Sequence, residues 1–253
     1  MTFTAAQLRT FSVCGERYRL ENIEGLPVYP TTRQIVSRIV RAGIQADLAA
    51  KLATGTLLSS QDAYGAIQAA ARAHISSEVA LTPAQVSSGN SRVFQQVAYQ
   101  ATRLGMMHHS VVAPRIEPTH LSRVVSCELG GHTLTAVVEI QEGSRTIRAT
   151  KVRSRKPEDG ESEGDIGLFI QALGLDRETG HMPDSAIVTY LVDGGKEVGI
   201  LKQEVEIDPN RVAALEHRVR QASAASESRV YSPADPQSWQ CRSCAHRMYC
   251  LYV

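Results

Sequence analysis

The chain ends in a cysteine-rich stretch, Gln240-Cys241-Arg242-Ser243-Cys244-Ala245-His246-Arg247-Met248-Tyr249-Cys250, which holds three of its five cysteines within ten residues. A fourth, Cys14, lies near the other end, in Leu8-Arg9-Thr10-Phe11-Ser12-Val13-Cys14-Gly15-Glu16-Arg17-Tyr18. A Cys-x₂-Cys step brings two thiolates onto one centre, and Cys250 and Cys14 would complete a set of four ligands. We therefore predict that the two ends of the chain close on one cysteine-ligated centre.

Four thiolates suit either zinc or an iron–sulfur cluster. A zinc ribbon usually has two Cys-x₂-Cys knuckles, whereas this chain has one knuckle, a Cys-x₅-Cys step and one remote cysteine. The spacing favours a 4Fe-4S cluster, with zinc as the alternative. Unliganded buried thiols are the third interpretation, which three cysteines in so short a stretch disfavour. Cys127 occupies an apolar position of a predicted strand, and we expect it to be a small core residue.

The composition is that of an ordinary globular protein, with 43% apolar and 21% charged residues in 253. The net charge of +1 gives no global attraction to nucleic acid or membrane, so any such site must be a local patch. No apolar run approaches the roughly 18 residues of a membrane span, and the N-terminus lacks the pattern of a signal peptide. We expect a cytoplasmic protein with reduced thiols and no membrane partner.

Residues 1–105 are predicted to be mainly helical. Thr4-x-x-Gln7 and Thr82-x-x-Gln85 have the form of capping boxes, in which a threonine and a glutamine satisfy the first backbone N–H groups of a helix. Apolar residues recur with helical spacing between such starts and stops. The predicted helices run from Thr4 to about Cys14, from Thr32 to near Gly55, from Ser60 to about His74, and from Thr82 to about Leu104.

Residues 106–226 are predicted to form an α/β core, since runs of β-branched residues alternate with turns such as Gly130-Gly131 and Glu142-Gly143-Ser144. The predicted strands are Val111–Ile116, Leu121–Glu128, Thr133–Gln141, Thr146–Val152, Ser185–Val192 and Val198–Ile207, with helices over Ile166–Leu175 and from Asp208 to about Ala225. Residues 227–253 form the cysteine segment. We predict one α/β domain over 1–253, with its C-terminal segment closing on Cys14.

These features together resemble a known family. Leu8-x₂-Phe11-x₂-Cys14-x₃-Tyr18, Cys241-x₂-Cys244-x₅-Cys250 and the element order between them resemble the iron–sulfur RecB-like nucleases of the PD-(D/E)XK superfamily. These include the CRISPR-associated adaptation exonucleases and the nuclease domain of the AddAB helicase–nuclease. The resemblance covers the whole chain and implies a restriction-endonuclease-like core, a mixed sheet flanked by helices. It also implies Mg²⁺ or Mn²⁺ held by acidic or histidine ligands, with a lysine near the scissile phosphate.

The catalytic positions that the resemblance implies are altered. Asp47 stands four residues after a glycine where the family has histidine; it could bind metal, or be a solvent-facing helical residue. Glu139 ends Ala136-Val137-Val138-Glu139, where the family has Gly-x-x-Asp. Gln171 matches one member of the family's Gln-x₃-Tyr pair, in either of two registers, without its partner.

The family's Glu-x-Lys is replaced by Ala149-Thr150-Lys151, which keeps the lysine and loses the acid. Alanine cannot bind a cation, so this change favours a weakened or inactive nuclease site. The alternative is a migrated acid, Glu163 or Asp165, that fills the gap left at Ala149.

A basic run follows the third core strand, and its side chains could follow a phosphate backbone with salt-sensitive affinity. Strand alternation places Arg145 on the face of Lys151, Arg153 and Arg155. The alternative is a charged strand edge that discourages aggregation. The predicted DNA-binding residues are Arg145, Arg148, Lys151, Arg153, Arg155 and Lys156.

The sequence therefore predicts a DNA-binding iron–sulfur protein with a nuclease fold and weakened or no activity. It would act as a subunit of a DNA-processing, defence or mobile-element complex, on single-stranded DNA or a DNA end. One alternative is an active Mg²⁺- or Mn²⁺-dependent single-stranded DNA exonuclease using Asp47, Glu139, a migrated acid and Lys151. Another is a zinc- or cluster-stabilised interaction module without a nucleic-acid role.

Overall fold

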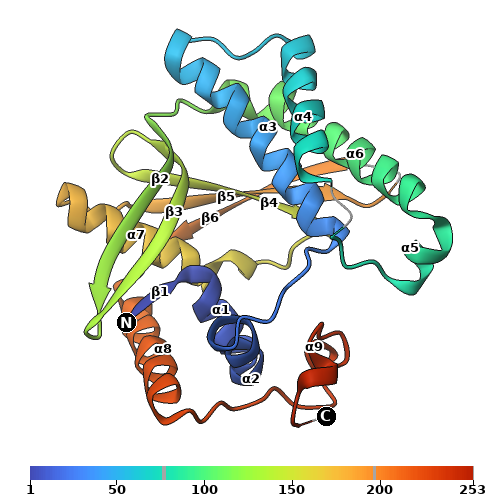
Figure 1. The fold of residues 1–253 in the computed structure, drawn as a ribbon. Helices are drawn as coiled ribbons and strands as arrows, with labels where there is room; N and C mark the ends of the chain where they lie inside the picture. The colour runs from blue at the N-terminus through green and yellow to red at the C-terminus, as the bar shows by residue number, and fades with distance from the viewer. Residues whose placement is uncertain (76–77, 196–197, 253) are drawn as a thin grey trace.

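One mixed β-sheet with helices on both faces organises the computed structural model, which describes residues 1–75, 78–195 and 198–252 (Figure 1). The strand order is β1-β3-β4-β5-β6, and β2 also pairs with β3. The β4–β5 and β1–β3 pairs are parallel, and the other pairs are antiparallel. The strands are β1 (Thr2–Thr4), β2 (His120–Leu129), β3 (His132–Glu142), β4 (Thr146–Arg153), β5 (Ser185–Asp193) and β6 (Val198–Glu206). The predicted fold class is confirmed.

The sheet forks along one edge of β3. The end of β3, Ile140–Glu142, pairs with the start of β4, whereas Thr133–Thr135 pairs with the short strand β1. Between these two ladders, residues 136–139 face a gap, and β4 diverges to pair with β5 over its full length. The fork leaves room in the sheet for side chains from β3 and β4.

Two hydrophobic clusters fill the space between the sheet and its helices. On one face, α1 (Ala5–Val13), α7 (Ile166–Thr179) and α8 (Pro209–Ser228) pack over a core that includes Leu134, Phe169 and Tyr190. On the other face, α3 (Thr32–Thr54) crosses the sheet, with α4 (Ser60–His74) and α6 (Asn90–Met107) beside it (Figure 1). The apolar stripe of α3 is buried there, as its helical spacing predicts.

The helix starts follow their capping residues. Thr4 and Gln7 form the predicted capping box of α1, and Thr82 and Gln85 form that of α5 (Pro83–Ser88). However, the prediction of one helix from Thr82 to Leu104 is wrong, because α5 ends at Gly89 and α6 begins anew. Gly89 has φ of 82°, a left-handed backbone conformation that glycine adopts without strain and that interrupts a right-handed helix.

The predicted strand Val111–Ile116 is also wrong. The chain instead continues α6 through a π-helical turn, η2 (His108–Val112), and a 3₁₀ turn, η3 (Ala113–Arg115). The cluster under α3 includes the buried residues Val112, Ala113 and Ile116. Their apolar side chains are therefore buried against helices and do not require a strand. The remaining predicted strands are present, and the predicted turn at Gly143 joins β3 to β4 in an antiparallel hairpin.

The segment around Cys14 contacts the C-terminal segment that begins after α8. The N-terminal region continues from α1 into α2 (Gly15–Tyr18) and η1 (Arg19–Ile23), and the C-terminal region holds α9 (Trp239–Arg242) and η5 (Arg247–Tyr249). The Gly15 N–H donates to the Ser232 carbonyl at 2.8 Å, and the Ala234 N–H donates to Cys14 Sγ at 3.3 Å. Within the described residues, no helix combines the length and apolar character needed to cross a membrane.

Candidate functional site

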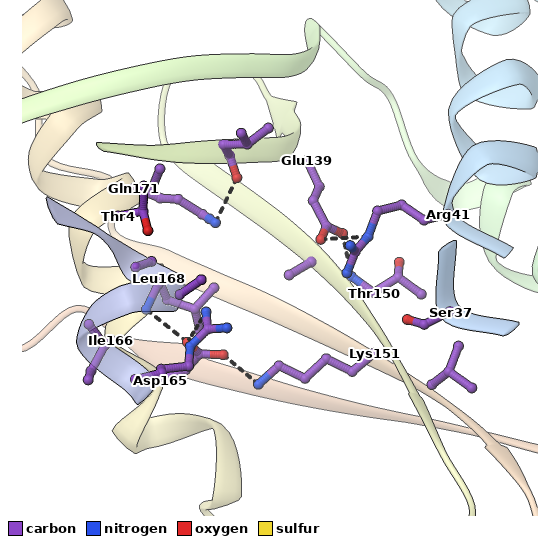
Figure 2. Close-up of a pocket in the computed structure, with 18 of the residues that line it drawn as sticks. Thr4, Ser37, Arg41, Glu139, Thr150, Lys151, Asp165, Ile166, Leu168 and Gln171 are labelled. Carbon is purple, nitrogen blue, oxygen red and sulfur yellow. Dashed lines mark hydrogen bonds and ion pairs between the residues drawn. The ribbon is translucent and has the colours of Figure 1, made fainter. Parts of the chain in front are cut away.

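A cleft of about 910 Å³ opens at the fork between β3 and β4 (Figure 2). Its walls come from β3, β4, the start of α1, the first half of α3, the turn η4 (Glu161–Gly164) and the start of α7. The charged and amide side chains that line it are Arg9, Arg33, Gln34, Arg41, Glu139, Lys151, Arg153, Glu161, Asp165 and Gln171.

Glu139 lies in the gap of the sheet. Its Oε2 accepts the Thr150 N–H at 3.0 Å, a backbone group that the divergence of β3 and β4 leaves available. Its Oε1 lies 3.0 Å from Nε of Arg41 on α3. Burial raises the pKa of Glu139, and Arg41, the Thr150 N–H and Lys151 act in the opposite direction. Arg41 is therefore the cation that balances this buried carboxylate.

Asp165 faces Lys151 on the other side of the cleft (Figure 2). Its carboxylate caps α7 by accepting the Gly167 N–H at 2.8 Å, and it pairs with Lys151 Nζ at 2.6 Å and with Arg9 Nη2 at 3.1 Å. Burial acts to raise the pKa of Asp165, but Arg9, Lys151 and the Gly167 N–H together lower it below its usual value. A Cβ at Gly167 would lie 2.4 Å from Arg9 Nη2, so a larger residue here would require the flexible Arg9 side chain to shift.

Of the two acids considered for the gap at Ala149, Asp165 is the one that lines the cleft beside Lys151. Glu163 instead pairs with Arg211 of α8 at 2.8 Å. Ala149 itself lines the cleft and offers no ligand. Within the part of the chain that the structure describes, no group of three or more His, Cys, Asp or Glu side chains is arranged to hold a metal ion.

The cleft carries more positive than negative charge, since five cationic and three acidic side chains line it. Arg33 contacts the Ser154 hydroxyl at 2.9 Å and is exposed to solvent. Gln171 donates to the Val137 carbonyl at 2.8 Å, and its buried Oε1 has no partner among the described residues. The arrangement can bind an anion through its arginines and can accept a hydrogen bond from an occupant at Gln171.

Asp47 is not among the residues that line the cleft. Its buried carboxylate accepts the Leu58 N–H at 3.0 Å and pairs with His109 Nδ1 at 2.9 Å. The solvent-facing alternative is wrong, because only 3% of its side chain is exposed.

The predicted row of basic side chains divides between different surfaces. Lys151 and Arg153 line the cleft, and Arg153 pairs with Glu161 at 2.5 Å. Arg148 pairs with Glu142, and alternation along β4 directs it to the opposite face of the sheet. Arg145 pairs with Asp184 at the other end of β4, and Arg155 and Lys156 are exposed beyond the strand. The other cations of the cleft, Arg9, Arg33 and Arg41, come from helices and match no motif.

The four cysteines Cys14, Cys241, Cys244 and Cys250 line one small cavity between the two ends of the chain. Cys14 Sγ accepts N–H groups from Arg17 at 3.4 Å and Ala234 at 3.3 Å. Desolvation is the main cause that raises the pKa of Cys241, and repulsion from the other three cysteines raises it further. The fifth thiol, Cys127, is buried in the core, and burial raises its pKa to about 11.

Comparison with known families assigns the chain to a superfamily. A profile of the PD-(D/E)XK nuclease superfamily matches residues 2–251. The chain belongs to this superfamily. Among solved structures, it is similar to a Eubacterium rectale protein named "Putative exonuclease", with 12% identity and a TM-score of 0.56 over 94% of this chain and 86% of that one. This likeness supports the fold alone.

A second solved structure, that of SSO0001, is 13% identical over 67% of this PD-(D/E)XK chain and 79% of its own, with a TM-score of 0.34. A search of curated proteins finds no match. Of the residues predicted from the family's motifs, Glu139 lies on β3 and Lys151 on β4, and β4 contains no acidic residue.

Proposed function

We propose that this PD-(D/E)XK chain binds DNA in the cleft at the fork and has weakened or no ability to cut it. One observation carries the proposal: the acid expected to bind metal, Glu139, pairs with Arg41, and the neighbouring motif position is Ala149. Superfamily catalysis requires a divalent cation between carboxylates and phosphate. Here a guanidinium already balances the carboxylate.

The residues present fit a divalent cation poorly. Both carboxylates nearest to Lys151 are engaged by cationic side chains, Glu139 by Arg41, and Asp165 by Lys151 and Arg9. A metal ion would have to displace these partners and would find no acid at Ala149. We therefore derive no hydrolytic step for the cleft. The excess of arginine and lysine supports binding of a phosphate backbone, with affinity that falls as salt increases.

An active nuclease with a changed ligand set is the second candidate. Asp165 lies 2.6 Å from Lys151 and so could replace the acid missing at Ala149. In that case Glu139 and Asp165 would exchange arginine for Mg²⁺ or Mn²⁺ when DNA and metal bind together. The two candidates agree on DNA binding and differ in metal-dependent cleavage.

We further propose that Cys14, Cys241, Cys244 and Cys250 hold a 4Fe-4S cluster, with zinc as the alternative. Their position around one cavity and the two N–H donors on Cys14 Sγ support this proposal, because hydrogen bonds to sulfur stabilise thiolate ligands. The four thiols as they stand are not arranged to hold a metal ion, so binding of the cluster would have to draw them together. The cluster would link the C-terminal segment to Cys14, the residue that precedes and caps α2. Reduced thiols of this kind fit a cytoplasmic protein.

A role as a subunit of a larger DNA-processing, defence or mobile-element complex is also part of the proposal. The C-terminal segment exposes 69% of Trp239, 93% of Met248 and 81% of Leu251. Exposed apolar side chains mark a protein-binding surface where they form one contiguous patch. They support a protein partner at the end of the molecule that carries the cysteines.

Fluorescence anisotropy of a labelled single-stranded oligonucleotide in EDTA, over a range of salt concentrations, tests the DNA-binding proposal. We expect the logarithm of affinity to fall linearly with the logarithm of salt, and Arg33→Ala to reduce the slope by about 0.7. The matched control is Arg145→Ala, which removes a basic residue outside the cleft and should leave the slope unchanged. Absence of binding at low salt, or an equal loss in both variants, would contradict the proposal.

A further inference from the structure

Outside the cleft, three side chains form a hydrogen-bonded chain across three elements. Ser60 Oγ at the start of α4 lies 3.4 Å from His109 Nε2 in η2, and His109 Nδ1 lies 2.9 Å from Oδ2 of Asp47 on α3. Only 3% of the Asp47 side chain and 11% of the His109 side chain are exposed, while Ser60 is exposed to solvent. The order from interior to surface is carboxylate, imidazole, hydroxyl.

The carboxylate is held so that it orients the imidazole. Asp47 Oδ1 accepts the Leu58 N–H at 3.0 Å, which leaves Oδ2 directed at His109 Nδ1. With its proton on Nδ1, the ring presents Nε2 as an acceptor toward the Ser60 hydroxyl. The Asp47–His109 pair alone would be enough to tie α3 to η2. The exposed hydroxyl on the remaining ring nitrogen is the feature that such a tie does not need.

The N-terminal end of α4 supplies backbone N–H donors near Ser60. The N–H groups of Asp62 and Ala63 donate to Oγ and to the carbonyl of Ser59. The N–H groups of Ser60 and Gln61 precede them at the open end of this 15-residue helix, where backbone N–H groups have no acceptor within the helix. An oxygen anion that forms beside Ser60 would therefore meet N–H donors and the positive end of the helix dipole.

We infer that Ser60, His109 and Asp47 form an acyl-transfer centre that accepts small carboxylic esters. A nucleophile in hydrogen-bond reach of a base, which is in turn oriented by a third group, is the arrangement that activates a serine, and the first distance is often long before a substrate binds. Ser60 is the nucleophile, His109 is the general base, and Asp47 is a positioning residue. Because the hydroxyl is exposed, the site takes unhindered acyl groups such as acetyl.

The reaction proceeds in two balanced halves. Ser60 Oγ adds to the ester carbonyl carbon as its proton passes to His109 Nε2, and the bond to the alcohol oxygen then breaks as His109 returns that proton to the leaving group. Water next adds to the acyl carbon, giving its proton to His109. The bond between Oγ and the acyl carbon breaks, Oγ regains the proton, and the carboxylic acid leaves.

Covalent labelling of the full-length chain with a fluorophosphonate, followed by intact mass and peptide mapping, tests the nucleophile. We expect one label per chain on Ser60, together with slow hydrolysis of p-nitrophenyl acetate, and loss of both in Ser60→Ala. Ser88→Ala removes another exposed helical serine and should change neither. An unlabelled wild type, or a Ser60→Ala variant labelled as fast as the wild type, would overturn the inference.

Asp47→Asn tests the positioning role. The amide oxygen can keep the Leu58 bond, while the amide nitrogen presents a donor to His109 Nδ1 and drives the ring proton to Nε2. We expect labelling to slow by about 100-fold or more, and the ¹⁵N spectrum of the His109 ring to show the change of protonated nitrogen. Unchanged labelling in a variant with the altered ring spectrum would refute the relay. If Asp47→Asn fails to fold, the exposed Ser60 and Ser88 variants still decide the nucleophile.

Discussion

Replacing Arg41 by alanine tests the ion pair on which the proposed loss of metal binding depends. The Glu139 side chain is 17% exposed, and among the residues that the structure describes its carboxylate would keep the Thr150 N–H as its hydrogen-bond partner. A hydrogen bond to a charged group contributes about 1.5–3 kcal/mol. Arg41 is itself 46% exposed, so solvent offsets part of this loss. We expect Arg41→Ala to lower the free energy of unfolding by about 1 kcal/mol near neutral pH.

The loss in Arg41→Ala should depend on pH. Burial raises the pKa of Glu139, so the folded state favours its protonated form. Stability from this group is fully present below the ordinary glutamate pKa and is lost as pH rises through the raised value. Removing Arg41 raises the pKa of Glu139 further, because the guanidinium opposes the effect of burial. The difference between wild type and variant should therefore be near zero at about pH 4 and reach its full size at about pH 8.

Urea denaturation followed by circular dichroism at both pH values measures this difference. Arg38→Ala, an exposed arginine on the same helix, is the matched control and should show no such pH dependence. In a Glu139→Gln background, Arg41→Ala should have little effect, since no carboxylate remains to be balanced. An equal loss at both pH values, or an undiminished loss in the Glu139→Gln background, would refute the reasoning.

Three further predictions concern other parts of the molecule. Burial lowers the pKa of His108 to about 4, so stability should fall from about pH 6.5 toward pH 4 as the unfolded state takes up the proton; His108→Leu should remove up to about 3 kcal/mol of this dependence in urea titrations. Cys14→Ser should abolish bound iron, measured per chain after anaerobic purification, whereas Cys127→Ala should retain it. Gly89→Ala should destabilise the fold by about 1–2 kcal/mol because φ is 82°, whereas Gly65→Ala within α4 should stabilise it by about 0.5–1 kcal/mol in the same assay.

Much of the secondary structure could be predicted because its signals are local. Capping boxes and helical spacing give the starts of α1, α3 and α4, and runs of β-branched residues bounded by turns give β2 to β6. The strand β1 has only three residues and forms through its parallel pairing with β3, so it leaves no periodic signal. The run Val111–Ile116 has the composition of a strand. It forms helical turns instead, because its apolar side chains pack against neighbouring helices in the folded chain.

The site was predictable only in part. Motif spacing identifies Glu139 and Lys151, which line the cleft. Their partners Arg41 and Asp165 are brought to them by the tertiary fold, and an arginine on a helix surface carries no sequence signal of this role. Asp47 matches a motif by its distance from a glycine. However, it lies six residues beyond Arg41 and hence about 240° around the helix, so it points away from the cleft.

Cleavage of an end-labelled single-stranded oligonucleotide, with protein in excess and Mn²⁺ present, tests the central claim most directly. The same samples are run on native gels for binding and on denaturing gels for length. We predict a retarded complex in which most of the DNA keeps its full length, for the wild type and for Glu139→Gln alike. Complete shortening of the DNA that the wild type produces and Glu139→Gln does not would contradict the claim and identify an active nuclease with a changed ligand set.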